Sequence, residues 1–293
     1  MEQSEVYIGA DIGGTKIMAG AVDRSGRIVT GPVSVPTIGD DRSEAIFNRI
    51  AETLDRMILE TEGENVRAIG LGVTGPLDTV DGVILECPQL PTMHFFPLRE
   101  KVEKRYGLPV IMDNDANALL LGESIWGAGR GHRIVLGYTL GTGLGCAIAV
   151  GGKLFTGTNG MAGEIWPSPD GEFTIEDTLS GRGVSGIFRT LTGLEKTAKS
   201  ISEEARKGDA NAIAAWKIFG RKMADAIAWG INTIDPGIVV LGGSIANSAD
   251  LFYDAMMERL PAFICPVPAQ KTRIVKALLG DNAGFMGAAA LAM

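Results

Sequence analysis

Four short polar side chains gather where an apolar run gives way to a helical pattern. Asp113, Asn114, Asp115 and Asn117 follow the strand-like residues 109–112 and precede an apolar helix. One Asp or Asn is enough to cap a helix, because its side chain accepts the first unpartnered backbone N–H groups. A carboxylate in this place can also accept a hydroxyl proton during phosphoryl transfer, which needs positioning more than unusual basicity. The number of polar groups exceeds the need for capping, so we favour a catalytic carboxylate.

A glycine turn near the N-terminus has the residue types of a phosphate site. Asp11 ends an apolar run, and Gly13, Gly14, Thr15 and Lys16 follow it. Backbone N–H groups in such a turn, with the Thr15 hydroxyl, can point at a phosphate. Asp11 can hold Mg²⁺ directly or through water. A plain β-turn with a solvated Asp remains the alternative, and the spacing matches neither a P-loop nor a Rossmann fingerprint.

A second glycine turn occurs in the segment GTGLG, at Gly141, Thr142 and Gly143. Shifted back by 128 residues, the stretch around this turn matches the first one in glycines, alanines and apolar positions. The matched pairs are Gly9 and Gly137, Gly13 and Gly141, Ala19 and Ala147, Ala21 and Ala149, and Val22 and Val150. Coincidence is possible for such common residues, but an internal duplication is the favoured interpretation. The second turn would then be a second phosphate site.

Three further stretches carry candidate binding groups. Gly242 and Gly243 follow an apolar strand and precede a helix, where they would let an adenine lie against the backbone or simply make a tight connection. Glu164 lies after glycines in a loop, and Glu176 lies shortly before a Ser-Gly turn. Both carboxylates can accept hydrogen bonds from sugar hydroxyls, although solvated loop charges look the same in sequence.

Alternating strands and helices predict an α/β fold that can position these groups. Two domains are expected from the length and the duplication, at 1–117 plus 281–293 and at 118–280. Strands are expected at 6–10, 17–22, 27–35, 66–73, 109–112, within 134–154, within 235–246 and at 273–277. Helices are expected at 41–62, 97–106, 117–125, 209–234 and 281–293, and a loop is expected at 160–183.

The composition excludes several classes of protein. The 293 residues carry a net charge of −8, which disfavours nucleic-acid and anionic-membrane partners. Cys87, Cys146 and Cys265 are far apart and lack CxxC spacing, so we expect buried free thiols and neither disulfides nor a thiolate zinc site. There is no signal-peptide pattern and no apolar run of membrane-spanning length. A cytoplasmic location is expected.

With these segments in view, the chain resembles the ROK family of sugar kinases, in the actin-like/hexokinase ATPase superfamily. The resemblance covers nearly the whole chain. The matching segments, in the family's order, are Asp11–Lys16, GVTGPLD (72–78), DNDAN (113–117), GTGLG (141–145), GMAGEI (160–165), SGRG (180–183) and LGGSIA (241–246). Because ten residues precede Asp11 in this sequence, the winged helix of the family's repressors is not expected here.

The resemblance implies two actin-like (ribonuclease H-like) domains with a nucleotide and sugar cleft between them. It implies Asp115 as the catalytic base. The sugar-binding candidates are Gly75, Gln89, Asn114, Asp115, Glu164 and Glu176. The candidates for Mg-ATP are Asp11, Gly13, Gly14, Thr15, Lys16, Gly141, Thr142, Gly143, Gly242 and Gly243, with Mg²⁺ near Asp11, directly or through water.

The chain departs from the family pattern in two places. The family's GEIGH segment and its zinc-binding cysteine cluster are replaced by GEIWPSPDGEFTIE, so Trp166 and Pro167 stand in place of Gly-His. No zinc is expected, and the missing His leaves the specificity near the first two sugar carbons open. Gln89 stands where an Asn is common in the family.

The resemblance implies an ATP-dependent, glucokinase-like kinase that phosphorylates a primary hydroxyl of a hexose. An N-acetylmannosamine kinase or a fructokinase is the alternative within this class, and polyphosphate is a possible donor. A non-catalytic sugar-binding or regulatory protein is the alternative from another class, motivated by the lost His and cysteine cluster. The resemblance also implies a homodimer whose small-molecule partners are a sugar and ATP.

Overall fold

A computed structural model describes residues 5–39, 41–61, 65–267 and 271–293. The chain forms two compact units, Met1–Arg130 together with Leu278–Met293, and Gly131–Ala277. The sequence placed the first boundary after residue 117 and the second after residue 280. The structure keeps α3 (Asp115–Ile125) in the first unit, because this helix packs along α9 (Ala283–Leu291).

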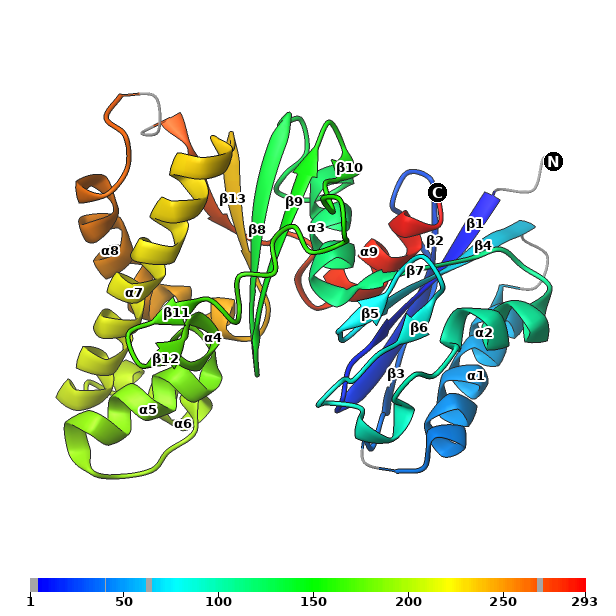
Figure 1. Cartoon of the computed structure of the whole chain (residues 1–293), viewed down its shortest axis with the longest axis horizontal. Helices are drawn as coiled ribbons and strands as arrows, with labels where there is room; N and C mark the ends of the chain where they lie inside the picture. The colour runs from blue at the N-terminus through cyan, green and yellow to red at the C-terminus, as the bar shows by residue number, and fades with distance from the viewer. Residues whose placement is uncertain (1–4, 40, 62–64, 268–270) are drawn as a thin grey trace. The chain divides into compact units, whose positions relative to one another are not determined.

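The first unit is built on a five-stranded sheet with the order β3-β2-β1-β4-β7 (Figure 1). β1 is antiparallel to β2 and parallel to β4, and β4 is parallel to β7. The strands are β1 (Glu5–Ile12), β2 (Lys16–Asp23), β3 (Ile28–Pro36), β4 (Asn65–Val73), β7 (Val110–Asn114) and the small pair β5 (Leu77–Asp78) and β6 (Val83–Ile84). The helices are α1 (Ser43–Glu60), η1 (Pro91–Met93), α2 (Leu98–Tyr106), α3, η5 (Gly280–Asn282) and α9.

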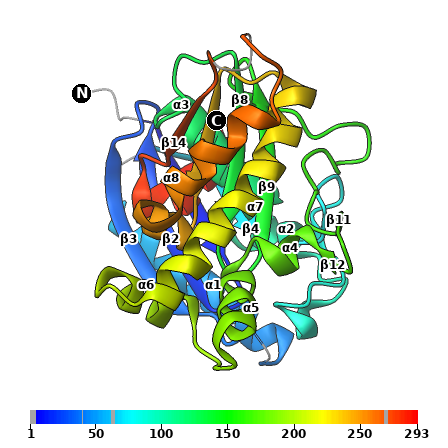
Figure 2. The same ribbon diagram turned by 90° about the vertical axis from the view of Figure 1, so that its left-hand side faces the viewer.

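The second unit repeats this plan in the sheet order β10-β9-β8-β13-β14. Its long helix α7 lies beside α8, and Figure 2 shows both helices across one face of the sheet. The strands are β8 (Ile134–Leu140), β9 (Leu144–Val150), β10 (Lys153–Leu154), β13 (Ile238–Gly242), β14 (Arg273–Lys276) and the small pair β11 (Pro169–Asp170) and β12 (Phe173–Thr174). The helices are α4 (Ile175–Thr178), α5 (Gly181–Thr192), α6 (Ala198–Arg206), α7 (Ala210–Ile234), η2 (Ile245–Ser248), α8 (Ala249–Arg259) and η3 (Leu260–Ala262).

The shared strand order confirms the predicted duplication and the α/β class. The turns differ by one residue, because Ile12 pairs with Ile17 across the first turn and Leu140 pairs with Leu144 across the second. The shift of 128 residues therefore holds for β1 and β8 but not for β2 and β9. Three predicted pairs were out of register by one residue: Ala19 and Ala147, Ala21 and Ala149, and Val22 and Val150.

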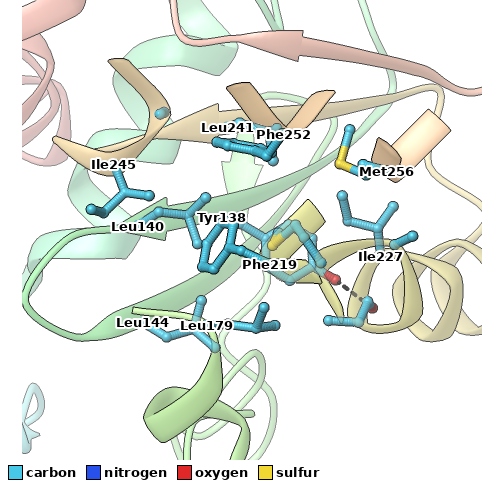
Figure 3. Close-up of a cluster of buried hydrophobic side chains, with 14 of the residues drawn as sticks. Tyr138, Leu140, Leu144, Leu179, Phe219, Ile227, Leu241, Ile245, Phe252 and Met256 are labelled. Carbon is cyan, nitrogen blue, oxygen red and sulfur yellow. Dashed lines mark hydrogen bonds between the residues drawn. The ribbon is translucent and has the colours of Figure 1, made fainter. Parts of the chain in front are cut away.

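Each unit has its own hydrophobic core under its sheet. In the second unit Tyr138 of β8 is buried among aliphatic and aromatic side chains, and its hydroxyl donates to the Ala226 carbonyl at 3.0 Å (Figure 3). Phe219 of α7 and Phe252 of α8 meet edge to face, with ring centroids 5.2 Å apart. A buried tyrosine needs such a hydrogen-bond partner, so the core satisfies its polar atom while it fixes α7 against the sheet.

Helix α9 packs against the first sheet through residues without side chains. A Cβ atom added at Gly9 would lie 1.9 Å from the Phe285 carbonyl oxygen, and one at Gly70 would lie 1.7 Å from that of Ala288. The alanine- and glycine-rich C-terminal segment was expected to be a close-packing helix, and the structure shows this packing against β1, β4 and α3.

Glu123 of α3 accepts hydrogen bonds from main-chain groups near residue 128, where the chain leaves the first unit, and at 278–279, where it returns to that unit. This fully buried carboxylate accepts N–H bonds from Ala128 at 2.7 Å, from Leu278 at 3.1 Å and from Leu279 at 2.7 Å. Backbone donors of this kind stabilise a buried carboxylate that would otherwise be costly.

Two further details of the expected organisation were wrong. The segment 160–183 is not a continuous loop, since it contains β11, β12 and the short helix α4, whose Thr174 and Asp177 form a capping box. The thiols of Cys87 and Cys146 are buried as expected, but Cys265 is exposed. In the described part of the chain, no helix has both the length and the apolar character needed to cross a membrane.

Candidate active site

The polar cluster at 113–117 lies at the junction of β7 and α3. Asn114 is the N-cap, and its Oδ1 accepts the Ala116 N–H at 2.8 Å. Asp113 accepts bonds from the Asn114 N–H at 2.7 Å and from Nδ2 of Asn117 at 2.8 Å. Asp115 is the first residue of the helix and is half-buried, with Oδ1 also 2.8 Å from the Ala116 nitrogen. Asn114 therefore caps the helix, and the Asp113 carboxylate is hydrogen-bonded to Asn114 and Asn117.

The turn that follows β4 lies against this cluster. β4 and β7 are parallel, so both strands deliver their carboxyl ends to the same edge of the sheet. A Cβ atom added at Gly75 would lie 3.1 Å from Nδ2 of Asn114. This close approach brings the Gly75 backbone to the predicted sugar-binding amide.

Gln89 belongs to the same region of the first unit. The Cys87 thiol donates to the Thr74 carbonyl and to Oε1 of Gln89, both at 3.5 Å. Burial raises the pKa of this thiol, and the charge of Asp115 contributes in the same direction. A Cβ atom added at Gly14 would lie 2.7 Å from the Gln89 carbonyl oxygen. The structure thus brings Gly14, Gln89 and Asp115 into one neighbourhood, with Cys87 as a link that the sequence did not reveal.

In the first glycine turn, some backbone groups are hydrogen-bonded within the unit and others are left for a ligand. The Gly13 N–H donates to the Lys16 carbonyl at 3.0 Å, and the Gly13 carbonyl accepts the Thr37 hydroxyl at 2.6 Å. Among the described residues, the backbone N–H groups of Gly14 and Thr15 have no acceptor. These two groups and the exposed Thr15 side chain are the part of the turn that can meet a phosphate.

Asp11 is the last residue but one of β1, and it is half-buried. Burial raises the pKa of this carboxyl to about 6, and the charge of Lys16 opposes the rise only in part. No hydrogen bond to the carboxylate is found within the described ranges, and Gly284 of α9 leaves it room, since a Cβ there would lie 2.4 Å from Oδ2. A partly desolvated carboxylate without donors is favoured by a cation, so Asp11 fits a Mg²⁺ ligand.

The raised pKa gives a testable dependence of stability on pH. The folded protein binds the Asp11 proton more tightly than an unfolded chain, whose ordinary pKa is 3.8. This contribution is complete below the unfolded value and is lost as pH rises through about 6. Asp11→Asn should therefore be more stable than wild type at pH 8 by about 1–3 kcal/mol, and the difference should vanish near pH 4. Thermal unfolding over this pH range measures it.

Millimolar Mg²⁺ provides the control for this prediction. It should raise the melting temperature of the wild type at pH 8 and leave that of Asp11→Asn unchanged, since only the carboxylate gains from the ion. Parallel pH curves for the two proteins would contradict the account of Asp11.

The second glycine turn, in the other unit, repeats the main-chain bond of the first. The Gly141 N–H donates to the Gly143 carbonyl at 3.0 Å, as the Gly13 N–H does to Lys16. The Gly181 N–H donates to the Gly141 carbonyl at 2.8 Å, which attaches the turn to the start of α5. Thr142 is exposed at the tip.

Glu176 holds this turn from the other side. Its Oε2 accepts the Leu144 N–H at 3.1 Å, and its Oε1 accepts Arg182 at 2.8 Å. A Cβ atom added at Gly143 would lie 2.5 Å from Oε2, so the glycine is needed for this approach. Glu176 is therefore not an ordinary solvated loop charge, because it joins the turn at 141–143 to α5.

Glu164 and Trp166 lie in the preceding loop. The indole Nε1–H of Trp166 donates to Oε2 of Glu164 at 2.7 Å, and the Trp166 carbonyl accepts the Glu176 N–H at 3.2 Å. Glu164 also lies near Cys146, where burial and then the charge of Glu164 raise the thiol pKa to about 12. The two predicted sugar-binding carboxylates are thus connected through Trp166.

An open cavity of about 1350 Å³ lies within the second unit, large enough for a nucleotide. It runs from Gly141 and Thr142 past the start of α5 to Ser244 and Ile245. Gly243 has φ +83°, and a Cβ there would lie 2.4 Å from the Leu140 carbonyl oxygen, so this glycine is required by the tight connection itself. Gly242 is the buried last residue of β13.

Known proteins are similar to this chain over nearly its whole length. The model of the ROK family matches residues 7–293. The chain belongs to the ROK family. A ROK family glucokinase from Streptomyces griseus, solved with glucose and AMPPNP, is 33% identical over 98% of both chains, with a TM-score of 0.82. This similarity confirms the expected α/β fold, which the structure builds on two five-stranded mixed sheets.

Curated relatives of the ROK chain carry two names. A protein from Thermotoga maritima named glucokinase is 31% identical over 97% of this chain and 96% of its own length. A protein from Vibrio parahaemolyticus named N-acetyl-D-glucosamine kinase is 34% identical over 98% of this chain and 99% of its own.

Proposed function

We propose that this ATP-dependent sugar kinase of the ROK family phosphorylates a primary hydroxyl of a hexose, with glucose as the leading substrate. The observation that carries the proposal is the half-buried carboxylate of Asp115 at the start of α3, beside the sugar-binding candidates Asn114, Gly75 and Gln89. The relatives named glucokinase support glucose, and the relative named N-acetyl-D-glucosamine kinase makes that sugar the second candidate.

In this mechanism Asp115 accepts the proton of the attacking hydroxyl. The hydroxyl oxygen forms a bond to the γ-phosphorus while the bond from that phosphorus to the oxygen bridging to the β-phosphate breaks, and ADP leaves with that electron pair. Proton transfer to a positioned base contributes about 10²–10⁴-fold to the rate.

Each glycine turn is proposed to contact phosphate oxygens of the nucleotide. Each turn keeps one N–H inside the turn and leaves its tip, at Gly14–Thr15 or at Thr142, for the nucleotide. Asp11 would hold Mg²⁺, directly or through water, and the bound ion would supply positive charge beside the phosphates. Glu164 and Glu176 are proposed to accept hydrogen bonds from sugar hydroxyls.

A panel of sugars in a coupled ADP-release assay tests the proposal. The panel holds glucose, mannose, fructose, N-acetylglucosamine and N-acetylmannosamine, each with ATP and with polyphosphate as donor. We expect ATP-dependent turnover with the highest kcat/KM on glucose. A clear preference for an N-acetylated sugar or for fructose would support the sugar-kinase activity but contradict glucose as the leading substrate.

Calorimetric titration separates the kinase from a non-catalytic sugar-binding protein. The kinase should bind both glucose and a non-hydrolysable ATP analogue. Sugar binding without nucleotide binding, together with no turnover on any member of the panel, would overturn the proposed function.

A further inference from the structure

Trp166 occupies a central place between two carboxylates of the second unit. Its side chain donates a hydrogen bond of 2.7 Å to Oε2 of Glu164, and its carbonyl accepts the N–H of Glu176 at 3.2 Å. The same segment is fixed at both ends by main-chain bonds, from Ser168 to the Ile165 carbonyl at 2.9 Å and from Ile175 to the Ser168 carbonyl at 2.8 Å. The indole therefore has a defined position rather than that of a loose loop side chain.

The ring is also accessible. Trp166 is 41% exposed, although large aromatic side chains are mostly buried in a folded protein. By contrast Trp216, on α7 in the same unit, is fully buried in the core. An exposed, fixed ring with an apolar face and a hydrogen-bonded polar edge can contact a ligand that is apolar on one face and carries hydroxyls at its rim.

We propose that Trp166 determines the sugar specificity of this kinase. Its indole N–H orients the Glu164 carboxylate toward a sugar hydroxyl, and its ring face packs against the C–H face of a pyranose. The inference rests on the proposed function, because it assigns Glu164 and Glu176 to the sugar. It adds a residue to the sugar site and a substrate class, pyranoses with equatorial hydroxyls.

The preference for glucose over mannose follows from the shape of the sugar face that packs against the indole ring. A pyranose with equatorial hydroxyls, such as glucose, presents axial C–H groups to a flat ring, whereas the axial hydroxyl at C2 of mannose interrupts one face. Aromatic packing of this kind is worth about 0.5–1.5 kcal/mol beyond area burial. Loss of the ring should therefore weaken glucose binding by about 2–12-fold, and mannose binding by less.

Two substitutions separate the roles of the ring and of its N–H. Trp166→Phe keeps an aromatic face and removes the donor to Glu164, whereas Trp166→Leu removes both. Trp229→Phe is the matched control, because Trp229 lies on α7 and is 76% exposed. The measurements are Kd for glucose and mannose by calorimetry, and KM for both sugars and for ATP.

We expect Trp166→Leu to raise Kd and KM for glucose by about fivefold to tenfold and to reduce the ratio of kcat/KM for glucose over mannose. Trp166→Phe should raise the glucose KM by a smaller factor, and the ATP KM should stay within about twofold in both variants. Trp229→Phe should match the wild type. Binding of glucose should also change the tryptophan fluorescence of the wild type, and Trp166→Phe should lose most of this change.

An unchanged glucose Kd and glucose-to-mannose ratio in Trp166→Leu, with wild-type melting temperature, would overturn the inference. If Trp166→Leu does not fold, Trp166→Phe decides instead. An unchanged glucose Kd and an unchanged glucose-to-mannose ratio in Trp166→Phe, with the glucose-induced fluorescence change retained, would overturn the inference. Failure of the proposed function is a different result, since the wild type would then phosphorylate no sugar of the panel. Calorimetry would still show whether Trp166 contributes to sugar binding.

Discussion

Asp115→Asn is expected to lower kcat by about 10²–10⁴-fold and to leave the KM for glucose within a few-fold. The amide has nearly the shape of the carboxylate, and its oxygen can still accept the Ala116 N–H that Oδ1 accepts at 2.8 Å. The local helix start is therefore retained while the proton acceptor is removed. Steady-state kinetics with saturating ATP, together with calorimetric titration of glucose, measure both parts of the prediction.

Asp113→Asn is the matched control for this substitution. Asp113 lies two residues away, and burial raises its pKa, but its carboxylate is occupied by Asn114 and Asn117. An asparagine oxygen can accept the same bonds, so kcat should fall by less than about tenfold. A wild-type kcat in Asp115→Asn, or equal losses in the two variants, would show that Asp115 is not the base.

Gly70→Ala is expected to destabilise the first unit by about 3 kcal/mol, the upper end of the usual cost of overpacking. The added methyl group would lie 1.7 Å from the Ala288 carbonyl oxygen, which belongs to the main chain of α9 and cannot turn aside. The helix would have to move away from β4 and lose its packing on the sheet. Thermal or urea unfolding, followed by circular dichroism, should show a melting temperature lower by roughly 5–10 °C.

Gly186→Ala provides the comparison for the same chemical change. Gly186 lies within α5 and has nothing within 4 Å of the added Cβ outside the backbone of its own helix. Alanine favours a helix over glycine by about 1 kcal/mol, so this variant should be as stable as the wild type or more stable. Equal melting temperatures for Gly70→Ala and the wild type would contradict the close packing of α9.

Much of the fold could be predicted because its strands and long helices carry regular patterns. The apolar face of α1 and the buried strand β13 have the periods of their elements, and both were found within a few residues. α5 was missed because its first residues, Gly181 to Gly183, fall in the predicted loop 160–183. Packing of α5 on α7 outweighs the low helix propensity of these glycines.

The site was predictable where the chemistry is local in sequence. The cluster at 113–117 shows its polar excess directly, whereas the bond between Trp166 and Glu176 depends on how a loop folds back. Gly284 lies against the Asp11 carboxylate, although the two residues are at opposite ends of the chain. No pattern in the sequence indicates this contact. The one-residue difference between the turns likewise appeared only in the strand pairing.

The position of the phosphate in the product tests the central claim most directly. Wild-type protein is incubated with glucose and ATP, and the product is analysed by phosphorus and proton NMR. We predict a single sugar product with phosphorus on the primary hydroxyl at C6, formed in step with ADP, and none from 6-deoxyglucose. Release of orthophosphate without a sugar phosphate, or a product phosphorylated at C1, would contradict the account.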